Sequence, residues 1–143
     1  MTRDELILAA LSAAGGGTFS PVQVQKLFFL IDQRIPGLIG GPYFDFEPYD
    51  YGPFDPAVYS ELEGLADRGC VEIISDQNLR WKKYRLTAKG LIAGTELFNQ
   101  LGPETSSYIS TLVQFVRRLS FAELVAAIYK EYPEMKVNSV FRQ

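Results

Sequence analysis

The sequence predicts a mainly α-helical protein with one β-hairpin, and three observations lead to this fold class. Apolar residues recur at helical spacing in successive segments, each bounded by a capping residue, a proline or a glycine. Two strand-like runs, residues 70–74 and 80–86, flank the polar turn Ser75-Asp76-Gln77-Asn78. Three helices precede this hairpin, which is the order of a winged helix-turn-helix. We therefore expect a winged helix-turn-helix with appended C-terminal helices.

The length and composition of the chain set its expected organisation. The chain has 143 residues, 47% of them hydrophobic and 22% charged, as in a globular protein with a substantial core. We predict a winged-helix-like domain over residues 1–101, with an aromatic insertion at 36–54, and a C-terminal helical extension over 102–143. The extension either dimerises or packs on the core, and by analogy with compact winged-helix proteins we expect a homodimer.

The first two helices are marked by their ends. A helix over residues 3–14 begins with acids and stops at a run of glycines. A second helix begins at Ser20-Pro21 with a capping box to Gln23 and ends before Pro36-Gly37, after which we expect a loop. Its apolar spacing predicts a buried face of Val24, Leu27, Phe28 and Ile31, and solvent-facing positions at Gln25, Lys26 and Gln33.

Residues 43–59 form the stretch that is richest in aromatic side chains. Seven rings occur there together with Asp45, Glu47, Asp50 and Asp55. Pro53 keeps Gly52 out of the α region, so Tyr51-Gly52-Pro53 should form a stiff corner. Asp55-Pro56 has the pattern of an N-cap followed by proline, which predicts a third helix over residues 56–68.

The remaining helices follow the hairpin. Thr87 should cap a helix over residues 87–101, with Leu91, Ile92 and Phe98 as core candidates. Gly102-Pro103 interrupts the chain before a helix at 104–119, and Ser120 with Glu123 forms a capping box for a last helix that ends at Pro133.

The composition argues against several classes of function. The chain has no histidine and one cysteine, Cys70, so Ser-His-Asp and Cys-His catalysis and the usual zinc sites are excluded. No apolar run is long enough to cross a membrane, and the acidic N-terminus is unlike a signal peptide. The single cysteine suits a reducing compartment. We expect a cytoplasmic, non-enzymatic protein without cofactor or metal.

Several motifs together resemble a known family. Val24-Gln25-Lys26-Leu27-Phe28-Phe29-Leu30 is followed by Tyr51-Gly52-Pro53, by Val58-Tyr59 and, at the end of the hairpin, by Tyr84-Arg85-Leu86-Thr87-x-x-Gly90. Over roughly residues 20–95 this set resembles the phage-associated Panacea, or SocA-like, antitoxin domains and, equally, the small YwgA-type bacterial proteins. The resemblance implies a winged-helix-like fold and a regulatory or toxin-neutralising role. The sequence departs from the antitoxin pattern at Phe29, where tyrosine is usual.

The basic hairpin is the first candidate for a binding site. Its second strand carries Arg80, Lys82, Lys83 and Arg85, with Trp81 beside them. Lysine and arginine displace counterions along a nucleic-acid backbone, so this hairpin could hold DNA phosphates. The alternative is a solvated edge strand that its charges protect from aggregation. DNA binding through Arg80, Trp81, Lys82, Lys83 and Arg85 is our leading functional prediction.

The third helix and the aromatic stretch point to a second candidate. The helix offers acids rather than the Arg, Lys, Asn or Gln side chains that read base edges, so it argues against conventional major-groove reading. The alternative function is an antitoxin-type module that binds a basic protein through Tyr49, Asp50, Tyr51, Phe54 and Tyr59. A weaker alternative is an enzyme that holds a metal through the acids of this stretch, although their spacing fits no EF-hand.

Overall fold

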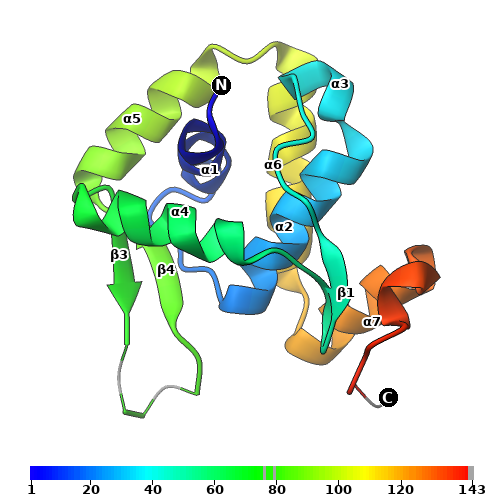
Figure 1. The fold of residues 1–143 in the computed structure, drawn as a ribbon. Helices are drawn as coiled ribbons and strands as arrows, with labels where there is room; N and C mark the ends of the chain where they lie inside the picture. Colours follow the sequence, from blue (N-terminus) through cyan, green and yellow to red (C-terminus); the bar gives the residue numbers. More distant parts are fainter. Residues whose placement is uncertain (76, 79, 142–143) are drawn as a thin grey trace.

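A computed structural model of the protein describes residues 1–75, 77–78 and 80–141. The described chain is mostly helical and has two small antiparallel hairpins (Figure 1). The fold class expected from the sequence, mainly α with a hairpin, is therefore confirmed. The elements, in order, are α1 (Arg3–Ser12), α2 (Pro21–Arg34), α3 (Pro36–Ile39), β1 (Glu47–Tyr49), β2 (Gly52–Phe54), α4 (Pro56–Asp67), β3 (Val71–Ile74), β4 (Lys83–Leu86), α5 (Ala88–Asn99), α6 (Pro103–Arg118), α7 (Phe121–Glu131) and the 3₁₀ helix η1 (Pro133–Lys136).

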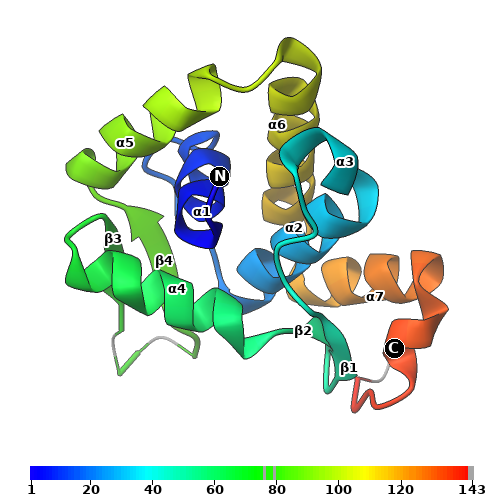
Figure 2. The ribbon, with the colours of Figure 1, turned by 45° about the horizontal axis from the view of Figure 1, so that its top comes forward.

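Helix α1 lies at the centre of the molecule. Every residue from Leu6 to Leu11 is buried, which is possible because α1 contacts α5, α4, α6 and β4 on different sides. Figure 2 shows α1 enclosed by α4, α5 and α6. The closest packing is with α5, where Gly94 lies so near α1 that a Cβ atom there would be 2.3 Å from the carbonyl oxygen of Leu8.

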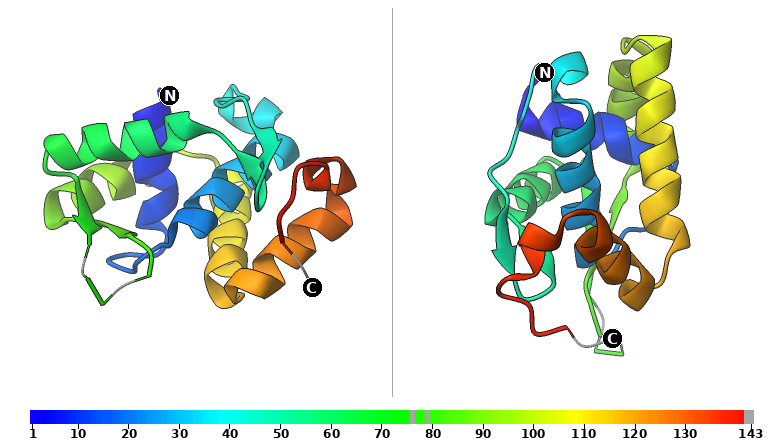
Figure 3. Two further views of the ribbon diagram at one scale, coloured as in Figure 1. Left: turned by 60° about the horizontal axis from the view of Figure 1, so that its bottom comes forward. Right: turned by 90° about the vertical axis from the view of Figure 1, so that its right-hand side faces the viewer.

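Helices α6 and α7 pack on the same hydrophobic core as the N-terminal helices. Helix α6 runs beside α2 and buries Ile109, Leu112, Val113 and Val116 (Figure 3). Helix α7 also contacts α2 and buries Leu124, Val125 and Ile128. The apolar face of the C-terminal extension is therefore covered within this one chain.

The β3–β4 hairpin has the register Val71↔Leu86 through Ile74↔Lys83. Phe19, from the loop between α1 and α2, extends it on the other edge of β4 through hydrogen bonds between Phe19 N and Tyr84 O (2.8 Å) and between Tyr84 N and Phe19 O (2.9 Å). The hairpin is thereby attached to the start of α2. Residue 76 of the expected turn and residue 79, which follows that turn, lie outside the described residues.

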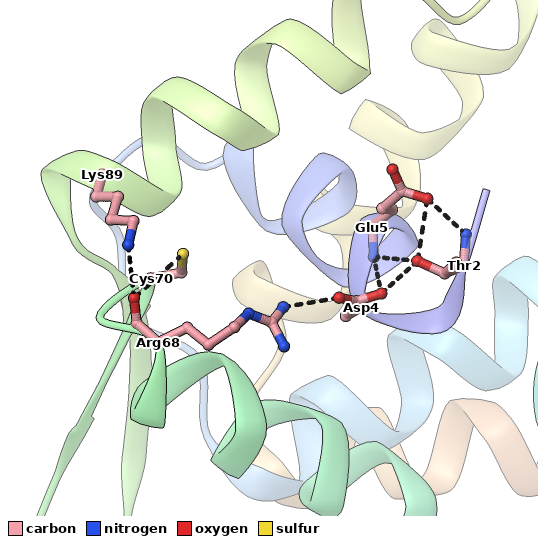
Figure 4. Close-up of polar contacts among 6 residues, drawn as sticks. All are labelled: Thr2, Asp4, Glu5, Arg68, Cys70 and Lys89. Carbon is pink, nitrogen blue, oxygen red and sulfur yellow. Dashed lines mark hydrogen bonds and ion pairs between the residues drawn. The ribbon is translucent and has the colours of Figure 1, made fainter.

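A network of polar contacts joins the ends of α1, α4 and α5 (Figure 4). Arg68, which follows α4, forms an ion pair of 2.7 Å with Asp4 in the first turn of α1, and its carbonyl oxygen accepts a hydrogen bond from Lys89 of α5. Both side chains of the ion pair are partly exposed to solvent, so its contribution to stability is small. The ion pair links α1 to the end of α4, and the hydrogen bond from Lys89 links α5 to the same residue.

Local sequence signals placed most helix ends correctly. Ser20, Asp55, Thr87 and Ser120 each accept the capping hydrogen bond that the sequence predicted. Gly69 has φ +77°, so it ends α4 in the left-handed conformation that glycine adopts most readily. Pattern recognition is reliable here because a cap depends only on residues a few positions apart.

Other local predictions were wrong. Residues 36–39 form the short helix α3 rather than a loop, and the aromatic insertion contains a second hairpin, β1–β2. The second strand of the basic hairpin begins at Lys83 rather than at residue 80. Ile92 was expected in the core but is 72% exposed, because α5 presents Gly90 and Gly94 to its neighbours instead.

Candidate functional site

A pocket of about 440 Å³ lies where the aromatic insertion meets the start of α2 and the start of α7. The first two turns of α2, the β1–β2 hairpin, Tyr59 of α4, and Leu119 to Phe121 before and in α7 line it, and Trp81 completes the wall. Its volume is within the range of pockets that hold small ligands or a few residues of a peptide. The β1–β2 hairpin lies beside α7 in the views of Figures 1 and 2, in agreement with the contact between α7 and β2.

Gln25 fixes the insertion to α2. Its side-chain amide donates to the carbonyl oxygen of Asp55 (3.0 Å) and accepts from the Asp55 backbone nitrogen (3.0 Å). The Asp55 carboxylate in turn accepts hydrogen bonds from the backbone nitrogens of Ala57 and Asp45. Both Gln25 and Asp55 are buried, so the expectation that Gln25 faces solvent was wrong: it is buried because it satisfies the backbone of the insertion.

Lys26 is the second polar side chain of α2 that the sequence placed on the surface, and it is only 3% exposed. Its Nζ donates a hydrogen bond to the carbonyl oxygen of Pro53 at 3.2 Å. Among the residues that the structure describes, no carboxylate is within ion-pair distance of Nζ. Burial without a counter-charge lowers the pKa of Lys26 to about 7.

The Tyr51-Gly52-Pro53 corner brings the insertion onto Lys26. Gly52 has φ +102°, a conformation that side chains with a Cβ atom rarely adopt. A Cβ atom at this position would lie 3.6 Å from Lys26 Nζ and 3.2 Å from the Tyr129 ring. The glycine is needed both for the turn and for this close approach.

Aromatic rings form much of the pocket wall. Tyr49 stacks on Phe54 with centroids 5.0 Å apart, and Phe54 meets Tyr59 edge to face at 5.7 Å. On the other side Phe121 and Tyr51 meet edge to face with centroids 5.0 Å apart, and Phe121 lies nearly parallel to Trp81 at 5.9 Å. Burial raises the pKa of Tyr59 to about 12, so its hydroxyl remains a neutral hydrogen-bonding group at ordinary pH.

The last described residues of the chain already lie on the β1–β2 hairpin. The backbone nitrogen of Val140 donates to the carbonyl oxygen of Asp50 (2.9 Å), and the Asn138 side chain donates to that of Pro48 (3.2 Å). The Phe141 ring lies 6.2 Å from Phe121. The segment thus attaches to backbone carbonyl oxygens of the hairpin, through the side chains of Asn138 and Ser139 and the backbone nitrogen of Val140.

The structure places the basic side chains of the β3–β4 hairpin on the surface, with different neighbours. Arg85 forms an ion pair of 3.0 Å with Glu72 across the hairpin. Arg80 covers one face of the Trp81 ring at 5.2 Å from its centroid. Lys82 and Lys83 are exposed, and neither forms an ion pair within the described part of the chain. Trp81 lies outside the strand and belongs to the pocket as much as to the hairpin.

The five residues predicted for protein binding, Tyr49, Asp50, Tyr51, Phe54 and Tyr59, all line the same pocket. Sequence reasoning missed the contributions of Lys26, Phe121 and Leu124. Lys26 could have been noticed because an unbroken apolar run, Leu27 to Ile31, follows it in α2. Nothing in the local sequence connects Phe121 to the insertion, because the two are distant along the chain.

Two further observations concern metal sites and membranes. Over the described ranges, no three or more acidic or cysteine side chains gather closely enough to hold a metal ion. Asp55, one of the acids considered for that role, serves as the N-cap of α4. Across residues 1–75, 77–78 and 80–141 no helix is both long and apolar enough to cross a membrane.

Comparison with known proteins adds no family assignment to this geometry. No protein-family model matches the chain, and no curated protein matches it significantly.

Proposed function

We propose that this protein is a non-enzymatic binding module, and that the pocket beside the aromatic insertion receives a short segment of a partner protein. The observation that carries the proposal is the convergence of Tyr49, Asp50, Tyr51, Phe54 and Tyr59 on one pocket. Tyrosine and tryptophan dominate the energetics of many protein interfaces because their large rings bind with little loss of conformational entropy.

The segment at residues 138–141 supports the choice of a peptide as ligand. It lies against the β1–β2 hairpin and is attached through the carbonyl oxygens of Pro48 and Asp50. The carbonyl oxygens of Pro48 and Asp50 are therefore acceptors that a partner peptide could use in place of this segment.

Charge supports a basic partner. The chain between Arg34 and Arg68 contains seven acidic residues and no basic one. Asp45, Glu47 and Asp50 are exposed on the insertion. Side chains of opposite sign on the partner would be attracted to this rim and would accelerate association at low salt.

Selection from random peptide libraries tests the proposal. Two libraries are used, one with free carboxyl ends and one with both ends closed by flanking sequence. We expect enriched peptides rich in lysine or arginine, with binding followed through the fluorescence of Trp81, the only tryptophan in the chain. Tyr51→Ala should weaken binding at least about 30-fold, as for a central aromatic contact.

The control for this test is Tyr108→Ala, which removes a tyrosine from α6 outside the pocket. It should leave the affinity within about twofold, as expected for a residue away from the binding surface. Failure of both libraries to yield a binder, or equal binding by Tyr51→Ala, would refute the proposal.

The second candidate function is DNA binding through the β3–β4 hairpin, as the wing of a winged helix-turn-helix formed by residues 1–101. Exposed Lys82 and Lys83 favour it, together with Arg80 nearby. Two observations argue against the reading of DNA base pairs by α4. Its exposed positions include Glu63 and Asp67, and the helix contains no lysine or arginine. We therefore expect contact with the phosphate backbone and little sequence preference.

Fluorescence anisotropy with a labelled duplex tests this second function. The duplex affinity should fall steeply as the salt concentration rises. The double variant Lys82→Ala, Lys83→Ala should bind more weakly, and its log affinity should fall less steeply with log salt concentration, by the amount expected for the loss of about two phosphate contacts. Lys130→Ala with Lys136→Ala, two lysines of the C-terminal region, is the matched control. Duplex binding that is absent even at low salt would eliminate this candidate.

The resemblance to antitoxin domains supplies the biological setting that we propose for either function: a cytoplasmic regulator that acts by neutralising or controlling a partner. A single buried cysteine, Cys70, is in keeping with a reducing compartment. The homodimer expected from the sequence also remains a proposal. Sedimentation velocity at two protein concentrations tests it, because a reversible dimer would dissociate on dilution.

A further inference from the structure

We propose that the pocket recognises the C-terminal residue of its partner, whose terminal carboxylate binds Lys26 while its apolar side chain lies between the aromatic walls. This inference rests on the proposed function and specifies which part of a partner chain enters the pocket. Three features of the site support it.

The first feature is the amine of Lys26, which is buried without a counter-charge and which an anion beside it would hold in the protonated form. The side chain lines the pocket, is buried, and has the Pro53 carbonyl as its hydrogen-bond acceptor. An ammonium group has three donors and gains most from a charged acceptor. Since no carboxylate of the described chain is within ion-pair distance, an anionic group on the ligand would supply the missing counter-charge.

The second feature is the direction of two helices. Ser20 to Gln23, at the start of α2, and Ser120 and Phe121, at the start of α7, line the same pocket. The N-terminus of a helix carries partial positive charge and favours a nearby anion. Two helix starts and one buried lysine thus favour an anion, while Asp50, which also lines the pocket, opposes it.

The third feature is the apolar wall beside the cation. Tyr51, Phe121 and Leu124 line the pocket together with Lys26. A C-terminal residue bears its carboxylate and its side chain on the same carbon atom, so it can occupy both parts at once. An aspartate or glutamate side chain ends in its carboxylate and has no apolar group beside it. The wall therefore favours a chain end over an internal acidic residue.

The arrangement also predicts the residues that precede the chain end. They would meet Asp50, which lines the pocket, and the exposed Asp45 and Glu47 of the insertion, all of which favour lysine or arginine. The expected ligand is a partner tail that is basic along its length and apolar at its final residue.

Chemical blocking of the chain end tests the inference with the unaltered protein. The tightest peptide from the library with free carboxyl ends is synthesised as the free acid and as the C-terminal amide. We expect amidation to weaken binding to the wild-type protein about 10- to 100-fold, as for loss of a charge-assisted hydrogen bond. In Lys26→Met, which keeps the apolar stem and removes the charge, the acid and the amide should bind equally.

Three outcomes would overturn the inference. One is equal binding of acid and amide by the wild-type protein. Another is enrichment only from the library with closed ends: if Tyr51→Ala abolishes that binding and Lys26→Met does not, the proposed function stands and the chain-end specificity is wrong. The third is saturation by N-acetylphenylalanine as tightly as by the best peptide, which would indicate a small carboxylate as ligand. Failure of both libraries refutes the proposed function itself.

Discussion

The side-chain amide of Gln25 and the backbone of Asp55 form two hydrogen bonds with each other, each 3.0 Å long. A residue inside helix α2 thereby binds the residue that caps helix α4. The pair holds the aromatic insertion between the two helices, and Lys26, the next residue in α2, holds the same insertion at Pro53. The position of the pocket depends on these contacts.

Replacement of Gln25 by alanine should destabilise the protein by about 2–3 kcal/mol, because a buried N–H and a buried C=O of Asp55 would each lose their partner. Urea unfolding followed by circular dichroism measures the change. Gln33→Ala, at an exposed position of the same helix, is the control and should change stability by less than about 0.5 kcal/mol. Similar effects of both substitutions would mean that the amide does not hold the insertion.

The stability of the protein should rise with pH between about 7 and 9. Burial lowers the pKa of Lys26 from 10.5 to about 7, so in this range the unfolded chain binds a proton that the folded chain does not. The cost of burying the charge is fully present below pH 7 and disappears progressively above it. A single such group gives a slope of up to about 1.4 kcal/mol per pH unit.

Urea unfolding at several pH values, compared between wild type and Lys26→Met, isolates this contribution. The methionine variant should lose the slope, whereas Lys89→Met, at an exposed lysine, should keep it. The pKa of Tyr59 is raised to about 12, so its titration lowers the stability of the protein only above about pH 10, outside this range. A wild-type protein whose stability is constant over this range would show that burial does not lower the pKa of Lys26.

Two helical glycines should respond to alanine with opposite signs. In α5, a Cβ atom at Gly90 would lie 1.9 Å from the Cys70 carbonyl oxygen, so Gly90→Ala should destabilise by about 3 kcal/mol or more. In α4, a Cβ atom at Gly64 would meet no atom within 4 Å apart from its own stretch of helix, so Gly64→Ala should stabilise by about 0.5–1 kcal/mol through helix propensity. Thermal melting distinguishes the two. Equal signs would contradict the packing of α5 against the start of β3.

The contact between Trp81 and Phe121 should be measurable by a double-mutant cycle. Their rings lie nearly parallel, at 12° and 5.9 Å, and such pairs contribute about 0.5–1.5 kcal/mol beyond simple burial. Unfolding of the two single alanine variants and the double variant should give a coupling of that size. The pair Trp81 and Ile92 should give less than about 0.5 kcal/mol. Additive effects at Trp81 and Phe121 would show that the hairpin does not rest on α7.

The sequence was informative about local structure and less so about the candidate site. Capping residues such as Ser20 and Thr87 were recognised because their hydrogen bonds stay within one turn. The aromatic residues of the insertion were correctly grouped because they are neighbours along the chain. Helical spacing predicted the buried face of α2 from its apolar residues alone.

That same spacing argument failed for Gln25 and Lys26. It assumes that a helix has one buried face, but α2 is covered by the insertion, by α6 and by α7. A polar side chain is then buried wherever a backbone carbonyl or amide can satisfy it, and the helix itself carries no sign of that partner. Trp81 and Phe121 were missed as a pair for a related reason, since their contact depends on where whole elements pack.

The stacking of Trp81 on Phe121 has a consequence for regulation. The same tryptophan belongs to the tip of the basic hairpin and to the wall of the pocket. If a peptide displaces Trp81 and a duplex binds the hairpin, each ligand must change the affinity of the other by the same factor, because their coupling is a property of one thermodynamic cycle. Through this one aromatic contact, a peptide in the pocket would change the affinity of the hairpin for DNA, and DNA on the hairpin would change the affinity of the pocket for the peptide.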